Sequence, residues 1–148
     1  MPNNPLEGRQ SLSITRHYNV SPEKVWRAWT DPEALGVWFK PEDAFTIAAA
    51  EADVRVGGRF RVLMISAEGK EHDVSGIYLE VIPNQKLVMT WTWKSDPKEE
   101  SLLTVTFRPS DGGTDLELKH EDFVEIDERI SHEDGWKGTL ALLERFLA

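Results

Sequence analysis

The spacing of apolar residues near the end of the chain predicts its longest helix, from Asp127 to Ala148. Apolar side chains recur there at intervals of four, three and four positions, which places them on one helical face. Leu142 and Phe146 are expected to widen that face, and Asp127 is expected to cap the first turn. So broad an apolar stripe has to cover a broad apolar surface. The residues that define the face are Trp136, Leu140, Leu143 and Leu147.

Period-two alternation predicts a series of strands ahead of this helix. It is clearest from Gln85 to Lys94, where one face holds only apolar side chains and the other holds valine and threonine. Turns such as Gly57-Gly58 and Ser110–Gly113 leave short connections, which make neighbouring strands antiparallel. The apolar face of the clearest strand is formed by Leu87, Met89, Trp91 and Trp93. The other alternating segments are 11–20, 45–54, 59–66, 72–82, 102–108 and 114–120.

Two short helices are predicted between the first strand and the later ones. Ser21-Pro22-Glu23 has the capping serine, first-turn proline and acid that start a helix, and Thr30–Glu33 ends it and starts another. The chain is therefore expected to adopt an α+β fold, in which a curved antiparallel sheet of about six or seven strands wraps around the long C-terminal helix. Residues 1–148 are expected to form a single domain, with residues 1–9 flexible.

The composition narrows the possible functions. The formal net charge of -9 argues against binding to nucleic acid or to anionic membrane surfaces, because both need a basic face. The chain has no cysteine, so neither disulfides nor thiolate chemistry is expected. No apolar run is long enough to span a membrane, and residues 1–10 lack the apolar core of a signal peptide. We therefore expect a cytoplasmic protein.

The histidines are the main candidates for chemistry. They are scattered along a chain that has no cysteine, so we expect no metal site and no cofactor. His120 shares the phase of Leu116 and Leu118, which places it on the inner face of the sheet. It is either a hydrogen-bonded histidine at the rim of the core or a ligand contact that could act as a general acid or base. Arg61 and His72 are further candidates, but the pattern leaves their facing open.

The residues around Trp136 allow two interpretations of the core. Gly135 and Gly138 flank Trp136 in the predicted helix, where each glycine costs about 1 kcal/mol relative to alanine. They either let the helix approach the sheet closely or leave room for a ligand between them. Aromatic and methionine side chains that fill a core also line apolar pockets. The expected ligand-binding residues are Met64, Tyr78, Met89, Trp91, Phe107, His120 and Trp136.

Motifs spread over nearly the whole chain point to a known family. They are Tyr18–Trp26, Thr30–Leu35 with Trp38-Phe39, Val56–Phe60, Gly76–Pro83, Leu87–Trp91, and Gly135-Trp136 with the apolar face that follows. Together they resemble the START-like superfamily, which has the helix-grip fold. More narrowly, they resemble the branch named for the C-terminal domain of the activator of the heat shock protein 90 ATPase. Members of the superfamily include lipid binders and polyketide cyclases, and the resemblance implies no shared catalytic motif.

Three functions are compatible with these features. The first is binding of a small, largely apolar ligand, such as a lipid or a polyketide, in a cavity between sheet and helix. The second is a cyclase- or hydrolase-like enzyme that uses His120 and a nearby carboxylate in that cavity. The third, which the resemblance alone implies, is an interaction domain that regulates a chaperone partner. The residues favour binding over catalysis and leave open whether the protein is a monomer or a homodimer.

Overall fold

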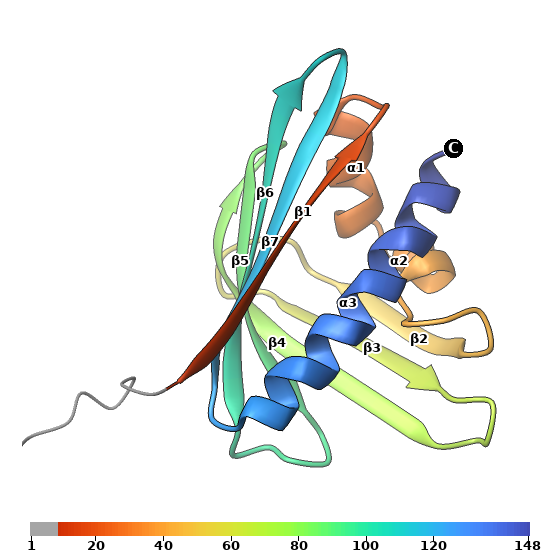
Figure 1. Cartoon of the computed structure of the whole chain (residues 1–148), viewed down its shortest axis with the longest axis vertical. Coiled ribbons are helices and arrows are strands. Elements are labelled where there is room, and N and C mark those ends of the chain that lie inside the picture. The colour runs from red at the N-terminus through yellow and green to blue at the C-terminus, as the bar shows by residue number, and fades with distance from the viewer. Residues whose placement is uncertain (1–8) are drawn as a thin grey trace, which may run out of the picture.

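The computed structural model describes residues 9–148, so the segment 1–9 that was expected to be flexible lies, apart from Arg9, outside the described residues. Within residues 9–148, seven strands and three helices follow one another in the predicted order (Figure 1). Their bounds are β1 (Gln10–Tyr18), α1 (Pro22–Thr30), α2 (Pro32–Trp38), β2 (Thr46–Ala52), β3 (Arg59–Ile65), β4 (Glu71–Ile82), β5 (Lys86–Trp93), β6 (Glu100–Ser110), β7 (Gly113–Phe123) and α3 (Ile126–Leu147).

The strands of the described chain form one antiparallel sheet in the order β1-β7-β6-β5-β4-β3-β2. The sheet curves around α3, which crosses its concave face, and α1 and α2 lie beside α3 on the same side (Figure 1). This is the predicted helix-grip arrangement. The short hairpin connections produce it, since each strand from β2 to β6 pairs with the next strand along the chain, and β1 pairs with β7.

The predicted facing of the central strands is confirmed. Successive side chains of a strand point to opposite faces, and only one face of this sheet is covered. Val88, Thr90 and Thr92 point to the convex face and are partly exposed. The side chains on the opposite face are buried: Met89, Trp91, Val105, Phe107, Leu116 and Leu118.

Capping fixes the two short helices where the sequence predicted them. Ser21 caps α1 and Asp31 caps α2, each accepting a backbone N–H of the first turn with a side-chain oxygen. Proline occupies the first helical position in both helices, where its missing N–H is not needed. The indole N–H of Trp38 donates to the Ala28 carbonyl at 2.9 Å, which ties α2 to α1.

Two details predicted for α3 are wrong. Asp127 lies in the first turn and does not cap the helix, because Glu125 occupies the N-cap position and makes no capping hydrogen bond with its side chain. Phe146 does not widen the buried face, since it is 39% exposed. Successive helical residues are about 100° apart, so Phe146 lies on the flank when its neighbour Leu147 faces the sheet. The buried face is therefore narrower than predicted and consists of Trp136, Thr139, Leu140 and Leu143.

The two glycines of α3 serve different purposes. A Cβ atom on Gly138 would lie 2.0 Å from the Pro41 carbonyl oxygen, so only glycine allows this close approach. A Cβ atom on Gly135 would meet no atom within 4 Å. The close-approach interpretation therefore applies to Gly138, and the open-space interpretation applies to Gly135.

This difference predicts opposite effects for the same substitution at two positions of one helix. Gly135→Ala should raise the free energy of unfolding by up to about 1 kcal/mol, because alanine favours the helix and meets open space. Gly138→Ala should lower it by about 1–3 kcal/mol, because the methyl group pushes against backbone at Pro41. Urea unfolding of both variants measures the difference. Equal effects at the two positions would contradict the close approach at Gly138.

Candidate functional site

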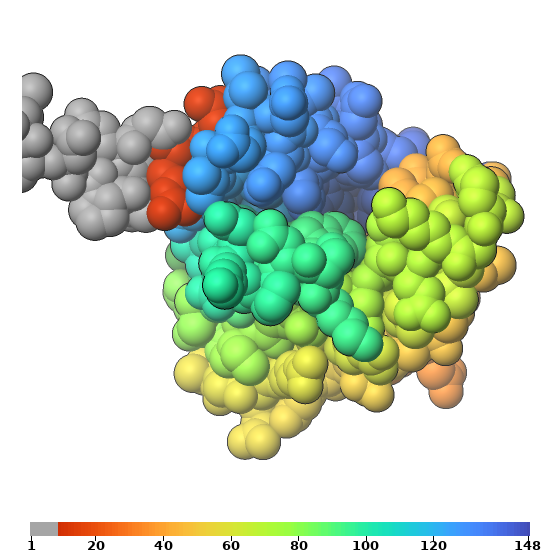
Figure 2. All heavy atoms as spheres, turned by 90° about the horizontal axis from the view of Figure 1, so that it is seen from below, coloured from red at the N-terminus to blue at the C-terminus, as the bar shows by residue number. Residues whose placement is uncertain are grey.

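A cavity of about 340 Å³ lies between α3 and the sheet. The surface is hollowed between α3 and the β3–β4 and β5–β6 connections (Figure 2). None of the lining side chains is a carboxylate, an ammonium or a guanidinium group. Aromatic rings dominate the lining, which consists of Phe39, Pro41, Phe45, Met64, His72, Trp91, Trp93, Ser131, His132, Gly135, Trp136 and Thr139.

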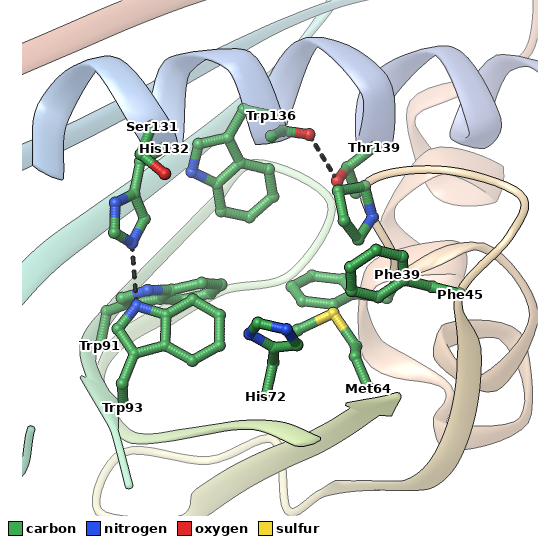
Figure 3. Close-up of a pocket in the computed structure, with 12 residues that line it drawn as sticks. Phe39, Phe45, Met64, His72, Trp91, Trp93, Ser131, His132, Trp136 and Thr139 are labelled. Carbon is green, nitrogen blue, oxygen red and sulfur yellow. Dashed lines mark hydrogen bonds between the residues drawn. The ribbon is translucent and has the colours of Figure 1, made fainter. Parts of the chain in front are cut away.

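Three parts of the chain build the walls (Figure 3). The sheet supplies the floor, where Met64 of β3 pairs directly with His72 of β4 and the two tryptophans of β5 lie alongside. One side of α3 supplies the roof, with Trp136 at its centre. The α2–β2 connection, residues 39–45, supplies the third wall through Phe39 and Phe45.

Polar contacts hold the α2–β2 connection against α3 and brace the connection internally. Arg145 of α3 pairs with Asp43 through two hydrogen bonds, one of 3.0 Å between Nη1 and Oδ2. Lys40 donates to the Phe45 carbonyl at 2.9 Å. With Pro41 seated over Gly138, these contacts place two phenylalanine rings beside the roof of the cavity.

One indole–imidazole hydrogen bond joins the floor to the roof. Trp93 Nε1 of β5 lies 2.9 Å from His132 Nε2 of α3 (Figure 3). An indole N–H can only donate, so His132 Nε2 must accept and the ring proton must lie on Nδ1. That proton is donated to the Glu128 carbonyl, 2.7 Å away. Both nitrogens of His132 are thus engaged.

A second indole–imidazole bond runs in the opposite direction, from helix to sheet. Trp136 Nε1 of α3 donates to His120 Nδ1 of β7 at 3.0 Å. The proton of His120 therefore lies on Nε2, which donates to Ser101 Oγ at 2.7 Å. Ser101 in turn donates to the Trp91 carbonyl at 3.4 Å. His120 cannot remove a proton from Ser101 in this arrangement, because the nitrogen facing the hydroxyl already carries one.

Burial keeps both histidines neutral. His120 is fully buried, which lowers its pKa well below the usual value, and the nearby His132 lowers it further. Burial also lowers the pKa of His132, and the hydrogen bond to the Glu128 carbonyl partly offsets that effect. Neutral imidazoles are what the network requires, since each must offer one lone pair to an indole.

The network leaves one indole without an acceptor. Three tryptophans, at positions 91, 93 and 136, surround two neutral imidazoles that can accept only one N–H each. Trp91 Nε1 is buried and has no hydrogen-bond partner among the described residues, and the same holds for Trp29 Nε1. A buried donor left unpaired costs about 1–3 kcal/mol.

The structure brings only part of the predicted ligand set to this cavity. Met64, Trp91 and Trp136 line it. Tyr78 and Met89 line a separate void of about 10 Å³ that also borders Phe39. Phe107 packs edge-on against Trp26, with ring centroids 5.5 Å apart. His120 is not among the lining residues and contacts the rings of Trp91 and Trp136.

Sequence reasoning missed several lining residues. Ser131, His132 and Thr139 stand one helical turn from Gly135 or Trp136, so helical spacing could have found them. His72 was a candidate whose facing was left open, and the structure places it in the lining. It shares the phase of the buried Val74, so that alternation could have indicated its inward facing. Phe39, Pro41 and Phe45 lie in or beside a connection that has no periodic pattern, so no signal of that kind pointed to them.

Neither a metal cluster nor a membrane helix is found in the described chain. No group of three or more histidine, aspartate or glutamate side chains in residues 9–148 could hold a metal ion. None of the helices described is long and apolar enough to cross a membrane.

The curved sheet, the helix in its grip and the cavity between them define a START-like helix-grip protein. Residues 19–148 match the family described as activator of Hsp90 ATPase homolog 1-like protein, and the chain belongs to that family.

Relatives and solved structures agree with this assignment. Human activator of 90 kDa heat shock protein ATPase homolog 1 is 26% identical over 127 residues, which cover 85% of this chain and 33% of the human protein. The chain therefore spans about a third of the length of the curated relatives it matches. Protein CV1439 of Chromobacterium violaceum superimposes with a TM-score of 0.85 at 27% identity, covering 93% of this chain and 96% of the other. The AHSA1 protein of Silicibacter pomeroyi superimposes with a TM-score of 0.83 at 27% identity, covering 93% of this chain and 97% of the other.

The network predicts unequal costs for two similar substitutions. Trp136→Phe leaves His120 Nδ1 buried without a donor, whereas Trp91→Phe removes an indole N–H that has no partner. Both side chains are 4% exposed, so the loss of packing is comparable. Trp136→Phe should therefore lower the free energy of unfolding by about 1–3 kcal/mol more than Trp91→Phe does. Denaturant unfolding measures both, and an equal cost would show that the bond to His120 contributes nothing.

The lowered pKa values of His120 and His132 predict a loss of stability in mild acid. Well above about pH 6.5 these histidines are neutral in both the folded and the unfolded chain, and their contribution is fully present. Below that pH the unfolded chain takes up protons first, so the free energy of unfolding falls until the pH reaches the folded pKa values. His17 contributes to the pH dependence of stability with the opposite sign, because its hydrogen bond to Asp115 raises its pKa.

Urea unfolding between about pH 7 and pH 5.5 tests this expectation, in a His17→Asn background that removes the opposing histidine. The variant should take up more than one proton on unfolding at the acid end of the range. A flat profile there would mean that the two buried imidazoles are not held neutral.

Proposed function

We propose that this protein binds a small, largely apolar molecule in the cavity between α3 and the sheet. The observation that supports the proposal is a cavity of about 340 Å³ with mainly aromatic walls and no charged lining side chain. Ligand sites of this kind are concave and mostly apolar, with a few polar groups that fix orientation. The proposal includes a cytoplasmic location and one domain over residues 1–148.

The indole–imidazole bonds support binding because they prevent α3 from settling onto the floor of the cavity. Trp93 and His132 meet across the gap, and their hydrogen bond sets the distance between β5 and α3 beside the cavity. Gly135 leaves the roof open at the middle of the lining. A preformed site spares the ligand the cost of opening it.

Filling the cavity from the helix should abolish binding without unfolding the protein. A thermal-shift screen of neutral aromatic hydrocarbons, fatty acids and sterols should yield compounds that raise the melting temperature of the wild type. A ligand at a hundred times its dissociation constant stabilises the folded state by about 2.7 kcal/mol. Gly135→Leu should lose these shifts, because the new side chain starts in open space within the lining.

Gly36→Leu is the matched control. It makes the same chemical change in α2, also meets no atom within 4 Å, and lies outside the cavity lining. It should retain the ligand-induced shifts. The proposal fails when no compound shifts the wild type, or when Gly135→Leu responds as the wild type does.

The geometry gives less support to an acid–base enzyme that uses His120. Both nitrogens of His120 are engaged by Trp136 and Ser101, and His120 lies outside the lining. General acid–base catalysis needs a group within reach of the substrate that can give or take a proton. Neither His120 nor His132 meets that condition in this arrangement.

A chaperone-regulating role is the second candidate, and family membership favours it. The human relative bears the name activator of 90 kDa heat shock protein ATPase, and this chain matches about a third of it. The direct test is the ATPase rate of a purified 90 kDa heat shock protein with and without this chain. Gly135→Leu separates the two candidates. It should abolish ligand binding in the cavity, whereas an interaction surface outside the cavity should keep its effect on the ATPase rate.

A further inference from the structure

His72 is the imidazole of the cavity that the polar network does not use. Trp93 and the Glu128 carbonyl engage both nitrogens of His132, and Trp136 donates to His120 behind the floor. His72 makes no side-chain hydrogen bond within the described part of the chain, although it lines the same cavity. One ring donor and one ring acceptor therefore stay available there.

The position of His72 suits contact with a flat molecule. It sits on the inner face of β4 directly beside Met64, and its ring rises from the floor towards α3 (Figure 3). Its ring centroid lies 5.5 Å from that of Phe45 and 6.5 Å from that of Trp93. An aromatic ligand in the cavity would thus lie among aromatic faces, with one imidazole at the floor.

The other polar groups of the lining restrict what the ligand can offer. The Thr139 hydroxyl donates its proton to the Gly135 carbonyl, so towards the cavity it can only accept. The indole N–H groups of Trp93 and Trp136 are already donated to histidines. The Trp91 N–H has no partner among the described residues, but its nitrogen is buried and offers no donor to the cavity. His72 and Ser131 can each donate and accept, so with Thr139 the described lining side chains offer three free acceptors and two free donors, which favours a ligand that carries a donor. A charged ligand would lose its hydration without finding an opposite charge among the lining side chains.

We propose that His72 is the specificity-determining residue of the cavity, and that the ligand is a neutral, planar aromatic molecule with a phenolic hydroxyl group hydrogen-bonded to the His72 ring. This inference rests on the proposed function, because it names the ligand class of the same site. The hydroxyl donates to the free imidazole nitrogen, and the aromatic body packs among Phe45, Trp93 and Trp136.

A pair of probes that differ in one group tests the inference. 2-Naphthol and 2-methylnaphthalene have nearly the same shape, and only the first carries a hydroxyl. Equilibrium dialysis measures the affinity of both probes for the wild type and for His72→Phe, which keeps an aromatic ring at the floor. The wild type should bind 2-naphthol about threefold to tenfold more tightly, the range that one net hydrogen bond gives. His72→Phe should lose that preference and retain its affinity for 2-methylnaphthalene.

Ser131→Ala is the matched control, because it removes a hydroxyl from the opposite wall of the cavity. It should keep the wild-type preference for 2-naphthol. A preference that survives in His72→Phe, or that disappears in Ser131→Ala instead, overturns the assignment of His72. Equal binding of both probes to the wild type also overturns it and leaves the proposed function standing. Binding of neither probe, in a protein that melts cooperatively, overturns this inference, and the proposed function then rests on the thermal-shift screen.

Discussion

Two hydrogen bonds of opposite direction fix the long helix over the sheet. Trp93 of β5 donates to His132 of α3, and Trp136 of α3 donates to His120 of β7. Apolar contact alone is not directional and would let a helix slide or roll on a concave surface. Each of these bonds instead requires one ring nitrogen at one place, so together they set both the rotation and the height of α3.

The two halves of the helix differ in how close they come to the rest of the protein. At Gly138 the backbone of α3 touches the Pro41 carbonyl, and at Leu140 the carbonyl accepts a 3.0 Å hydrogen bond from the Tyr18 hydroxyl. Towards the N-terminal half, Gly135 faces open space and the indole–imidazole pairs span the gap. The cavity results from a helix whose C-terminal half packs closely against the rest of the protein and whose N-terminal half is held above the sheet by polar side chains.

The sequence predicted the parts of this arrangement that depend on local periodicity. Alternation placed Trp91 and His120 on the inner face, and helical spacing placed Trp136 on the buried face of α3. Periodicity could not predict which tryptophan would meet which histidine, because the Trp93–His132 pair depends on how far α3 is rotated above the sheet. The position of the α2–β2 connection could not be predicted for another reason. The connection forms no regular element, and contacts with Gly138 and Arg145 set its position. Nor could a pattern show that Phe146, apolar though it is, lies on the flank of a stripe narrower than expected.

The protonation of His132 is linked to the contents of the cavity. Its Nε2 can take a second proton only by losing the hydrogen bond from Trp93, and both residues line the cavity. An apolar ligand that covers them removes more water from the imidazole and so disfavours its charged form further. Linkage between two binding events is reciprocal. Protonation of His132 must therefore lower the affinity for the ligand by the same factor by which the ligand lowers the affinity of His132 for a proton. The bond that positions α3 therefore also makes an empty, acidified site less able to hold its shape than a filled, neutral one.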